Sequence, residues 1–156
     1  MKKILIALDY NPNAEKIAET GHALAKSMEA EIILLHVMEE TAYYSAYEYS
    51  PIMGFNNFSS SDLLLPDRLN DLRNGVADFL EKSKEHLGGR RIETLIKEGE
   101  VAATIVQTAK ELQADIIVLG SHSRRGLDKI LMGSVTEKVL RHTTVPLFII
   151  PTREKN

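Results

Sequence analysis

Residues 3–28, KILIALDYNPNAEKIAETGHALAKSM, contain the unit that decides the fold class. The continuous apolar run from Ile4 to Leu8 is typical of a strand that is buried on both faces. Residues 11–13 (Asn-Pro-Asn) interrupt this run and offer caps for a helix. Apolar and small residues then recur with the spacing of an amphipathic helix, at Ile17, Gly21, Leu24, Ala25 and Met28. The stretch therefore predicts a buried strand followed by a helix.

The same alternation continues along the chain. Further strands are predicted at residues 32–37, 92–96, 116–119 and 145–150, and further helices at 69–87, 105–112 and 135–140. Gly88 and Gly89 provide a stop for the 69–87 helix. Strands that alternate with helices form a parallel sheet covered on both faces, and right-handed crossovers leave few topologies. We predict one α/β domain over residues 1–156, a doubly wound open parallel sheet of five strands in the order 3-2-1-4-5.

The composition excludes several classes of protein. Of the 156 residues, 44% are hydrophobic and 26% charged, which are ordinary values for a globular domain. The net charge of −3 argues against a nucleic-acid-binding protein, because such a protein normally carries a basic excess. The absence of cysteine excludes disulfides and thiolate metal sites. The five histidines show no short ligand spacing, so we predict no metal site.

We expect no targeting or membrane segment in this sequence. The first apolar run ends at Asp9 and is too short for a secretory signal. No apolar run approaches the ~18 residues that a membrane span requires. We expect a soluble cytoplasmic protein.

The segment of residues 38–68 departs from the regular alternation. It is far longer than the roughly 2–6 residues usual for a connection in such a fold. Six of the nine aromatic residues lie in it: Tyr43, Tyr44, Tyr47, Tyr49, Phe55 and Phe58. Two interpretations remain open, a lid or partner-binding loop and an insertion that packs its rings on its own surface.

Two predicted strand ends carry residues suited to a nucleotide. The first strand ends in Asp9, whose carboxylate can accept hydrogen bonds from a ribose hydroxyl or an adenine amino group, or can merely cap the first helix. The fourth strand ends in Gly120, which permits close backbone approach, and Ser121, His122 and Ser123 follow with backbone N–H groups. Ligands of open α/β sheets bind beyond the carboxyl ends of the strands, where the strand order reverses. We expect both ends to meet in one crevice.

The start of the fourth predicted helix adds an anion site. Gly133 and Ser134 open this helix, whose unpaired N–H groups and positive dipole end attract an anion. The hydroxyls of Ser134 and Thr136 can bind a phosphate or a phosphate-bound Mg²⁺. Three nearby basic residues add positive charge, namely Arg124, Arg125 and Lys129. The pattern favours phosphates on the Gly/Ser loop, with the base and ribose near the first two strands.

These residues and the five-strand pattern resemble the universal stress protein family over essentially the whole chain. Its ATP-binding members carry Gly-x2-Gly-x9-Gly-[Ser/Thr] here; Gly120, Gly133 and Ser134 match, and Ser123 replaces the second glycine while keeping a backbone N–H. The resemblance implies a stress-related regulatory protein that binds ATP, with Mg²⁺ as a candidate counter-ion and no assigned catalytic residue. The resemblance puts Asp9 and Val37 at the adenosine end, and it puts around the ribose and phosphates Gly120, Ser123, Gly133, Ser134 and Val135. We predict that Ala7, His122 and Arg124 also belong to the nucleotide site.

The last predicted strand bears on assembly. From Val145 to Ile150 both faces are apolar, and Pro146 belongs at a strand start or a sheet edge. An apolar edge invites pairing with another chain, so we expect a two-fold homodimer through this strand, in agreement with the family resemblance. The alternative function is a dimeric stress or interaction protein that binds no nucleotide and acts through its surface or the 38–68 loop. P-loop and G-x-G-x-x-G motifs do not occur in the expected places, which excludes those two nucleotide-binding classes.

Overall fold

The computed structural model describes residues 1–9, 13–39, 66–121 and 133–152. The sheet is all parallel, and its strand order is β3-β2-β1-β4-β5. The five strands are β1 (Lys3–Ala7), β2 (Glu31–Met38), β3 (Ile92–Glu98), β4 (Ile116–Gly120) and β5 (Leu147–Ile150). The predicted fold class and strand order are confirmed.

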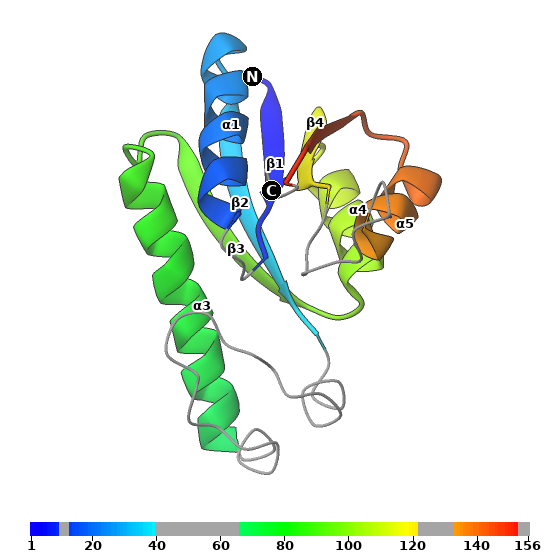
Figure 1. Ribbon diagram of the computed structural model, residues 1–156. Coiled ribbons are helices and arrows are strands. Elements are labelled where there is room, and N and C mark those ends of the chain that lie inside the picture. Colours follow the sequence, from blue (N-terminus) through cyan, green and yellow to red (C-terminus); the bar gives the residue numbers. More distant parts are fainter. Residues whose placement is uncertain (10–12, 40–65, 122–132, 153–156) are drawn as a thin grey trace, which may run out of the picture.

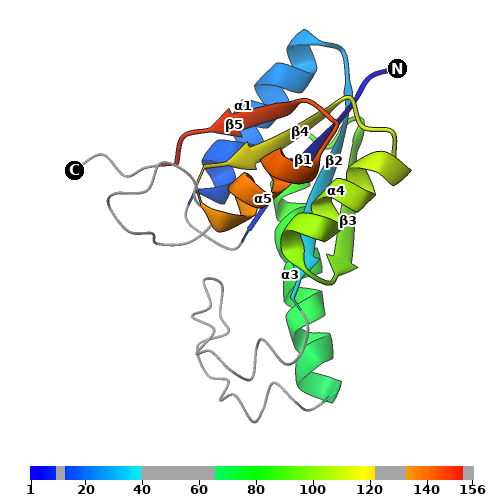
Figure 2. The same cartoon turned by 90° about the vertical axis from the view of Figure 1, so that its right-hand side faces the viewer.

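Two layers of helices enclose the sheet (Figures 1 and 2). Helices α1 (Ala14–Ser27) and α3 (Pro66–His86) cover one face, and α4 (Val101–Glu111) and α5 (Ser134–His142) cover the other. The side chains of each strand alternate between the two faces, so Ile4 and Ile6 pack towards α1 and α3, whereas Leu5 and Ile33 pack towards α4. The sheet therefore separates two apolar cores.

Helix α1 lies unusually close to the middle of the sheet. A Cβ atom added to Gly21 would stand 2.6 Å from Cδ1 of Ile6 on β1 and 3.4 Å from Cγ1 of Val118 on β4. Only a residue without a side chain fits there unless the core shifts. The glycine inside the helical pattern is thus a packing requirement, and it brings α1 onto the β1–β4 junction.

The predicted helix ends agree with the structure at some places and differ at others. Gly88 and Gly89 have φ angles of 95° and 68° and end α3 as expected, because this left-handed conformation favours glycine. Helix α4 begins at Val101 and not near Ile105, because the Glu100 side chain caps its first turn. The interpretations of the aromatic loop fall mostly on residues 40–65, outside the described residues. Among the described residues, no helix is both long and apolar enough to cross a membrane.

Candidate functional site

The candidate site lies at the carboxyl ends of β1 and β4. These strands are direct neighbours, with Ile6 opposite Val118 in the register. The chain leaves β1 towards α1 on one face and leaves β4 towards α5 on the other face. The strand order reverses between them, which is the position where open α/β sheets bind ligands.

Gly120 ends β4 at a crowded point. A Cβ atom there would stand 2.5 Å from Cδ1 of Ile17 and 3.0 Å from Cγ2 of Thr152. Both contacts are with buried residues that have little room to move. Gly120 is therefore required by the packing of α1 and the C-terminal segment against the end of β4.

Ser121 forms hydrogen bonds that link the end of β4 to β5, to Thr152 and to the start of α5. Its backbone N–H donates to the Ile150 carbonyl at 2.8 Å, so this group is not free for a phosphate, contrary to the expectation from the sequence. Its hydroxyl oxygen accepts from the Thr152 N–H at 3.0 Å. Its carbonyl accepts from the Gly133 N–H at 2.6 Å. The last bond holds the start of α5 beside the end of β4.

The first turn of α5 presents donors without a side-chain cap. Gly133 is the N-cap residue, and its carbonyl accepts the first bond of the helix from the Glu137 N–H at 3.0 Å. The N–H groups of Ser134, Val135 and Thr136 precede this bond and have no partner within the helix. The positive end of the helix dipole reinforces them, so the turn is suited to an anion.

Thr136 has a different role from the one expected. Its side chain is buried, and its hydroxyl donates to the Gly120 carbonyl at 2.8 Å. The hydroxyl proton is therefore used inside the fold and does not reach a phosphate. The bond fixes α5 against β4, while Ser134 is exposed and keeps its side chain on the outside.

An apolar surface and a carboxylate lie on the β1–β2 side. Ala7 is opposite Leu35 in the register, and β2 continues to Met38 beyond the end of β1. Val37 is buried in the core that faces α4 and α5, and the partly buried Ala7 packs against this core. Asp9 lies two residues after the end of β1 and is partly buried.

His36 is a buried residue next to this edge whose role the sequence did not reveal beyond its place in the sheet. Its Nδ1 lies 2.8 Å from the Leu8 carbonyl, and since a carbonyl only accepts, Nδ1 carries the proton. Burial lowers the pKa of His36, against the opposing effects of the Leu8 hydrogen bond and the Asp9 charge. A neutral imidazole thus holds the backbone just before Asp9.

The structure brings together only part of the predicted site. The Ser121 carbonyl accepts from Gly133, and the Thr136 hydroxyl donates to the Gly120 carbonyl. These two bonds bring Gly120 and Gly133 together with the first turn of α5, which contains Ser134 and Val135. Ala7, Asp9 and Val37 lie at the ends of the neighbouring strands. His122, Ser123 and Arg124 lie outside the described residues.

A sheet of this order, with a helix that starts at the β1–β4 switch point without a side-chain cap, defines a doubly wound α/β protein. Residues 1–151 match the universal stress protein family, and the chain belongs to this family.

Relatives match over nearly their full length. Universal stress protein MJ0577 of Methanocaldococcus jannaschii is 28% identical over 155 residues, which cover 96% of this chain and 94% of that protein. Universal stress protein YxiE of Bacillus subtilis is 30% identical over 154 residues, covering 95% of this chain and 97% of its own.

Solved structures share the fold. The structure of MJ0577 has a TM-score of 0.74 and covers 99% of this chain and 98% of its own. The universal stress protein of Archaeoglobus fulgidus in complex with dAMP has a TM-score of 0.58 at 17% identity, covering 96% of this chain and 98% of its own. At that identity the likeness concerns the fold alone.

Proposed function

We propose that this protein is a stress-related regulatory protein that binds ATP at the carboxyl ends of β1 and β4. The observation that carries the proposal is the first turn of α5. Its N–H groups at Ser134, Val135 and Thr136 lie at the switch point, and its N-cap residue Gly133 has no side chain to satisfy them. A phosphate group is an anion that such a turn binds well.

The remaining residues fit the other parts of a nucleotide. Asp9 would accept hydrogen bonds from the ribose or the adenine amino group, and Ala7 and Val37 would offer apolar surface beside the base. Gly120, Gly133, Ser134 and Val135 would surround the ribose and phosphates. His122, Ser123 and Arg124 would complete the phosphate side, where Mg²⁺ would serve as counter-ion.

One protein of the same fold has been solved with an adenine nucleotide. The Archaeoglobus fulgidus universal stress protein was solved in complex with dAMP. We propose binding and regulation rather than dedicated catalysis, because no described residue at this edge is identified as a general base for hydrolysis. We also propose that residues 1–156 form a single domain.

We also propose a homodimer that pairs through β5. Among the described residues, this strand is at the edge of the sheet and pairs with β4 alone. Phe148 on β5 is 37% exposed and Leu140 on α5 is 49% exposed, which leaves apolar surface next to an open strand edge. Analytical ultracentrifugation at micromolar concentration should show a dimer, and a monomer alone would contradict this assembly.

The nucleotide proposal has a direct test. Freshly purified protein is denatured and filtered, and the filtrate is run on anion-exchange chromatography against adenine nucleotide standards. In parallel, the melting temperature of nucleotide-free protein is measured with Mg-ATP and with Mg²⁺ alone. Bound ATP or ADP, or a rise in melting temperature with ATP, supports the proposal. An empty filtrate together with no shift at millimolar ATP would overturn it and favour the interaction protein that binds no nucleotide.

A further inference from the structure

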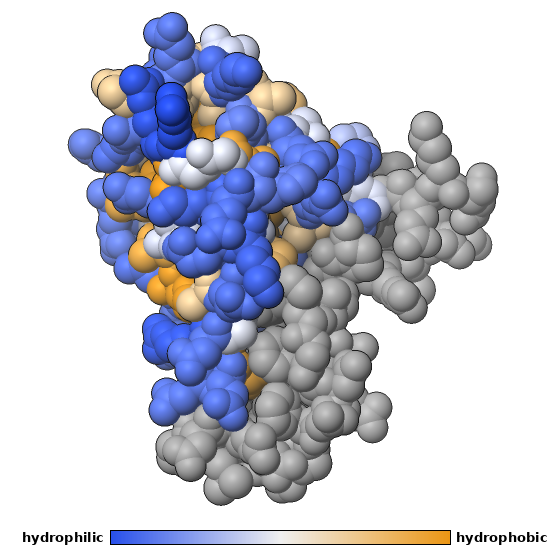
Figure 3. All heavy atoms as spheres, turned by 90° about the vertical axis from the view of Figure 1, so that its left-hand side faces the viewer, coloured by the Kyte–Doolittle hydropathy of each residue, from blue (hydrophilic) through white to orange (hydrophobic). Residues whose placement is uncertain are grey.

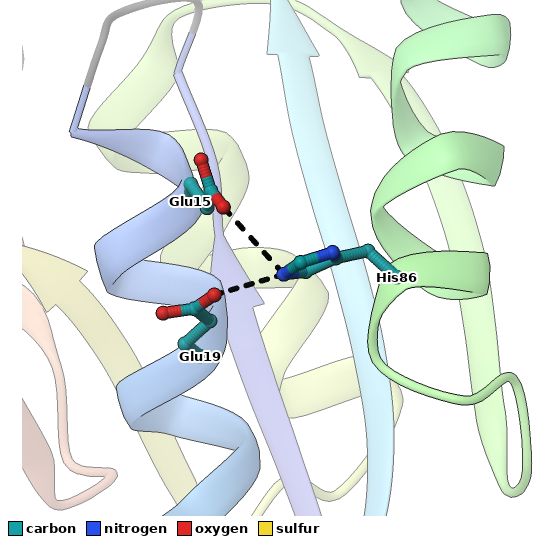
Figure 4. Close-up of side chains that lie close together, drawn as sticks. All are labelled: Glu15, Glu19 and His86. Atoms are coloured by element: carbon teal, nitrogen blue, oxygen red, sulfur yellow. Dashed lines mark hydrogen bonds and ion pairs between the residues drawn. The ribbon is translucent and has the colours of Figure 1, made fainter.

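Three side chains that offer metal ligands meet between α1 and α3. Glu15 and Glu19 stand one turn apart on α1, and His86 is the last residue of α3 (Figure 4). His86 Nε2 lies 2.8 Å from Glu19 Oε1 and 3.6 Å from Glu15 Oε1. The three ligand atoms all lie within 4.8 Å of one another. Two helices that are distant in the sequence thus supply one nitrogen and two oxygens at a single point.

The spacing of these atoms agrees with one metal ion. A tetrahedral Zn²⁺ bound at about 2.0–2.1 Å holds its ligand atoms about 3.4 Å apart. The separations of the two carboxylate oxygens from Nε2, 2.8 Å and 3.6 Å, lie on either side of that value. Small rotations of the three side chains, which are 53–70% exposed, would complete the geometry.

The charges at the cluster favour a cation. Glu15 and Glu19 are like charges at i and i+4, an arrangement that destabilises a helix unless a positive charge compensates it. The ion pairs that the described residues form with these two carboxylates both come from His86. Figure 3 shows that this side of the molecule, where α3 lies, is mostly hydrophilic. A divalent ion would compensate both carboxylates at once.

We propose that Glu15, Glu19 and His86 form a binding site for a divalent transition-metal ion such as Zn²⁺. The imidazole ligand selects this class over Mg²⁺ and Ca²⁺, which prefer oxygen ligands. Water or an external ligand completes the coordination, because the three residues are exposed. The ion links the start of α1 to the end of α3, two helices on the same face of the sheet.

The proton competes with the metal for His86. The hydrogen bond to Glu19 raises the pKa of His86, with help from the charges of both carboxylates. A metal ion must displace this proton, so the titrations belong at pH about 8, well above the ordinary histidine value of about 6.5.

The test is isothermal titration of Zn²⁺ into nucleotide-free, chelator-treated full-length protein. We expect one site per chain with a Kd on the order of 1–10 µM. His86→Gln and Glu19→Gln should each weaken binding by at least about tenfold. His142→Gln is the matched control, because it removes an exposed histidine at the end of α5, away from the cluster, and it should bind within about twofold of the parent. Excess Mg²⁺ should not displace Zn²⁺.

A second measurement does not depend on the variants. In a ¹H–¹³C spectrum of the histidine rings, Zn²⁺ should shift the His86 signals first and leave those of His142 unchanged at one equivalent. The proposal is overturned if the parent does not bind Zn²⁺, or if His86→Gln binds it as tightly as the parent. It is also overturned if the first equivalent shifts another histidine. These outcomes do not depend on the proposed ATP site, because ATP binding is measured in separate experiments without Zn²⁺.

Discussion

Helices α4 and α5 begin at the same edge of the sheet, but only α4 has a side chain that caps its first turn. The N-cap residue of α4 is Glu100, with φ −72° and ψ 129°, and that of α5 is Gly133, with φ −67° and ψ 158°. The Glu100 carboxylate accepts from the N–H groups of Ala102 and Ala103 at 3.3 Å and 2.7 Å. Gly133 provides no such acceptor.

The difference lies in the side chain and not in the backbone. Both N-cap residues have an extended conformation that any amino acid can adopt, so the φ angle does not require glycine at position 133. Helix α4 satisfies its own donors and even pairs its cap with Lys138 of α5 at 3.7 Å. Among the described residues no side chain caps the first turn of α5, which is why we propose the phosphate site there.

The largest expected effect follows from giving α5 the cap that α4 has. Gly133→Asp should satisfy the first turn internally and put a negative charge where we propose that the phosphates bind. Like charges placed together cost several kcal/mol, so ATP affinity should fall at least about 100-fold, or about 2.7 kcal/mol. The fold should be stabilised by a few tenths of a kcal/mol. Isothermal titration and thermal melts measure both effects.

Gly133→Ala is the matched control, because it adds neither a cap nor a charge. Its ATP affinity should stay within about tenfold of the parent, which is about 1.4 kcal/mol. If Gly133→Asp binds ATP as well as Gly133→Ala does, the α5 turn does not hold the phosphates.

The second difference between α4 and α5 is the hydrogen bond that a buried threonine of each helix forms. The Thr136 hydroxyl bonds from α5 to the Gly120 carbonyl of β4, whereas the Thr108 hydroxyl bonds to Thr104 within α4. Thr136→Val should lower the free energy of unfolding by about 1–3 kcal/mol, because it removes a bond between two elements. Thr108→Val should cost less than about 1 kcal/mol, since a backbone bond of the helix remains. Equal losses in urea denaturation would contradict the bracing role of Thr136.

His36 should make a pH-dependent contribution to the free energy of unfolding. Because burial lowers the pKa of His36, the unfolded chain takes up a proton near the ordinary value of 6.5 while the folded chain does not. Stability should therefore be fully present above that value and fall as the pH drops below it, with a slope of at most about 1.4 kcal/mol per pH unit from this group. His36→Asn should flatten the slope in denaturant melts between pH 7 and about 5. An unchanged slope would mean that His36 is not the group responsible.

The smallest effect is expected from removing the cap of α4. Glu100→Ala should lower the free energy of unfolding by about 1 kcal/mol, because two first-turn donors lose their acceptor. ATP affinity should not change, since α4 takes no part in the phosphate site. A loss of ATP binding in this variant would show that the two helix starts are not separate.

The overall fold could be predicted because its signals are local. Uninterrupted apolar runs such as Ile4 to Leu8 identify buried strands, and helical spacing between them leaves a parallel sheet with few topologies. The order 3-2-1-4-5 follows from neighbouring first and fourth strands, and the structure has that order. Gly88 and Gly89 also acted as predicted, because a helix stop is a local feature.

Roles that depend on tertiary contacts could not be predicted. The Gly120 contact with Ile17 joins two strand–helix units that are distant in the sequence. The donor pairing of Ser121 and Thr136 depends on how closely β4, β5 and α5 approach. Glutamate is also not among the usual N-cap residues, so the early start of α4 carried no sequence signal.

The cluster between α1 and α3 could not be predicted for a similar reason. Short spacings between histidines do not indicate it, because His86 is 67 residues from Glu19. Two glutamates one turn apart on a helix are common and indicate nothing alone. Only the packing of α3 against the same face as α1 brings the nitrogen ligand to them.

The most direct test of the difference between α4 and α5 is a titration of ¹⁵N-labelled protein with Mg-ATP. We expect saturable shifts of the backbone amides of Ser134, Val135 and Thr136, and no comparable shift of Ala102 and Ala103, which Glu100 already binds. Shifts that are absent at millimolar ATP, or that are as large at α4 as at α5, would contradict it.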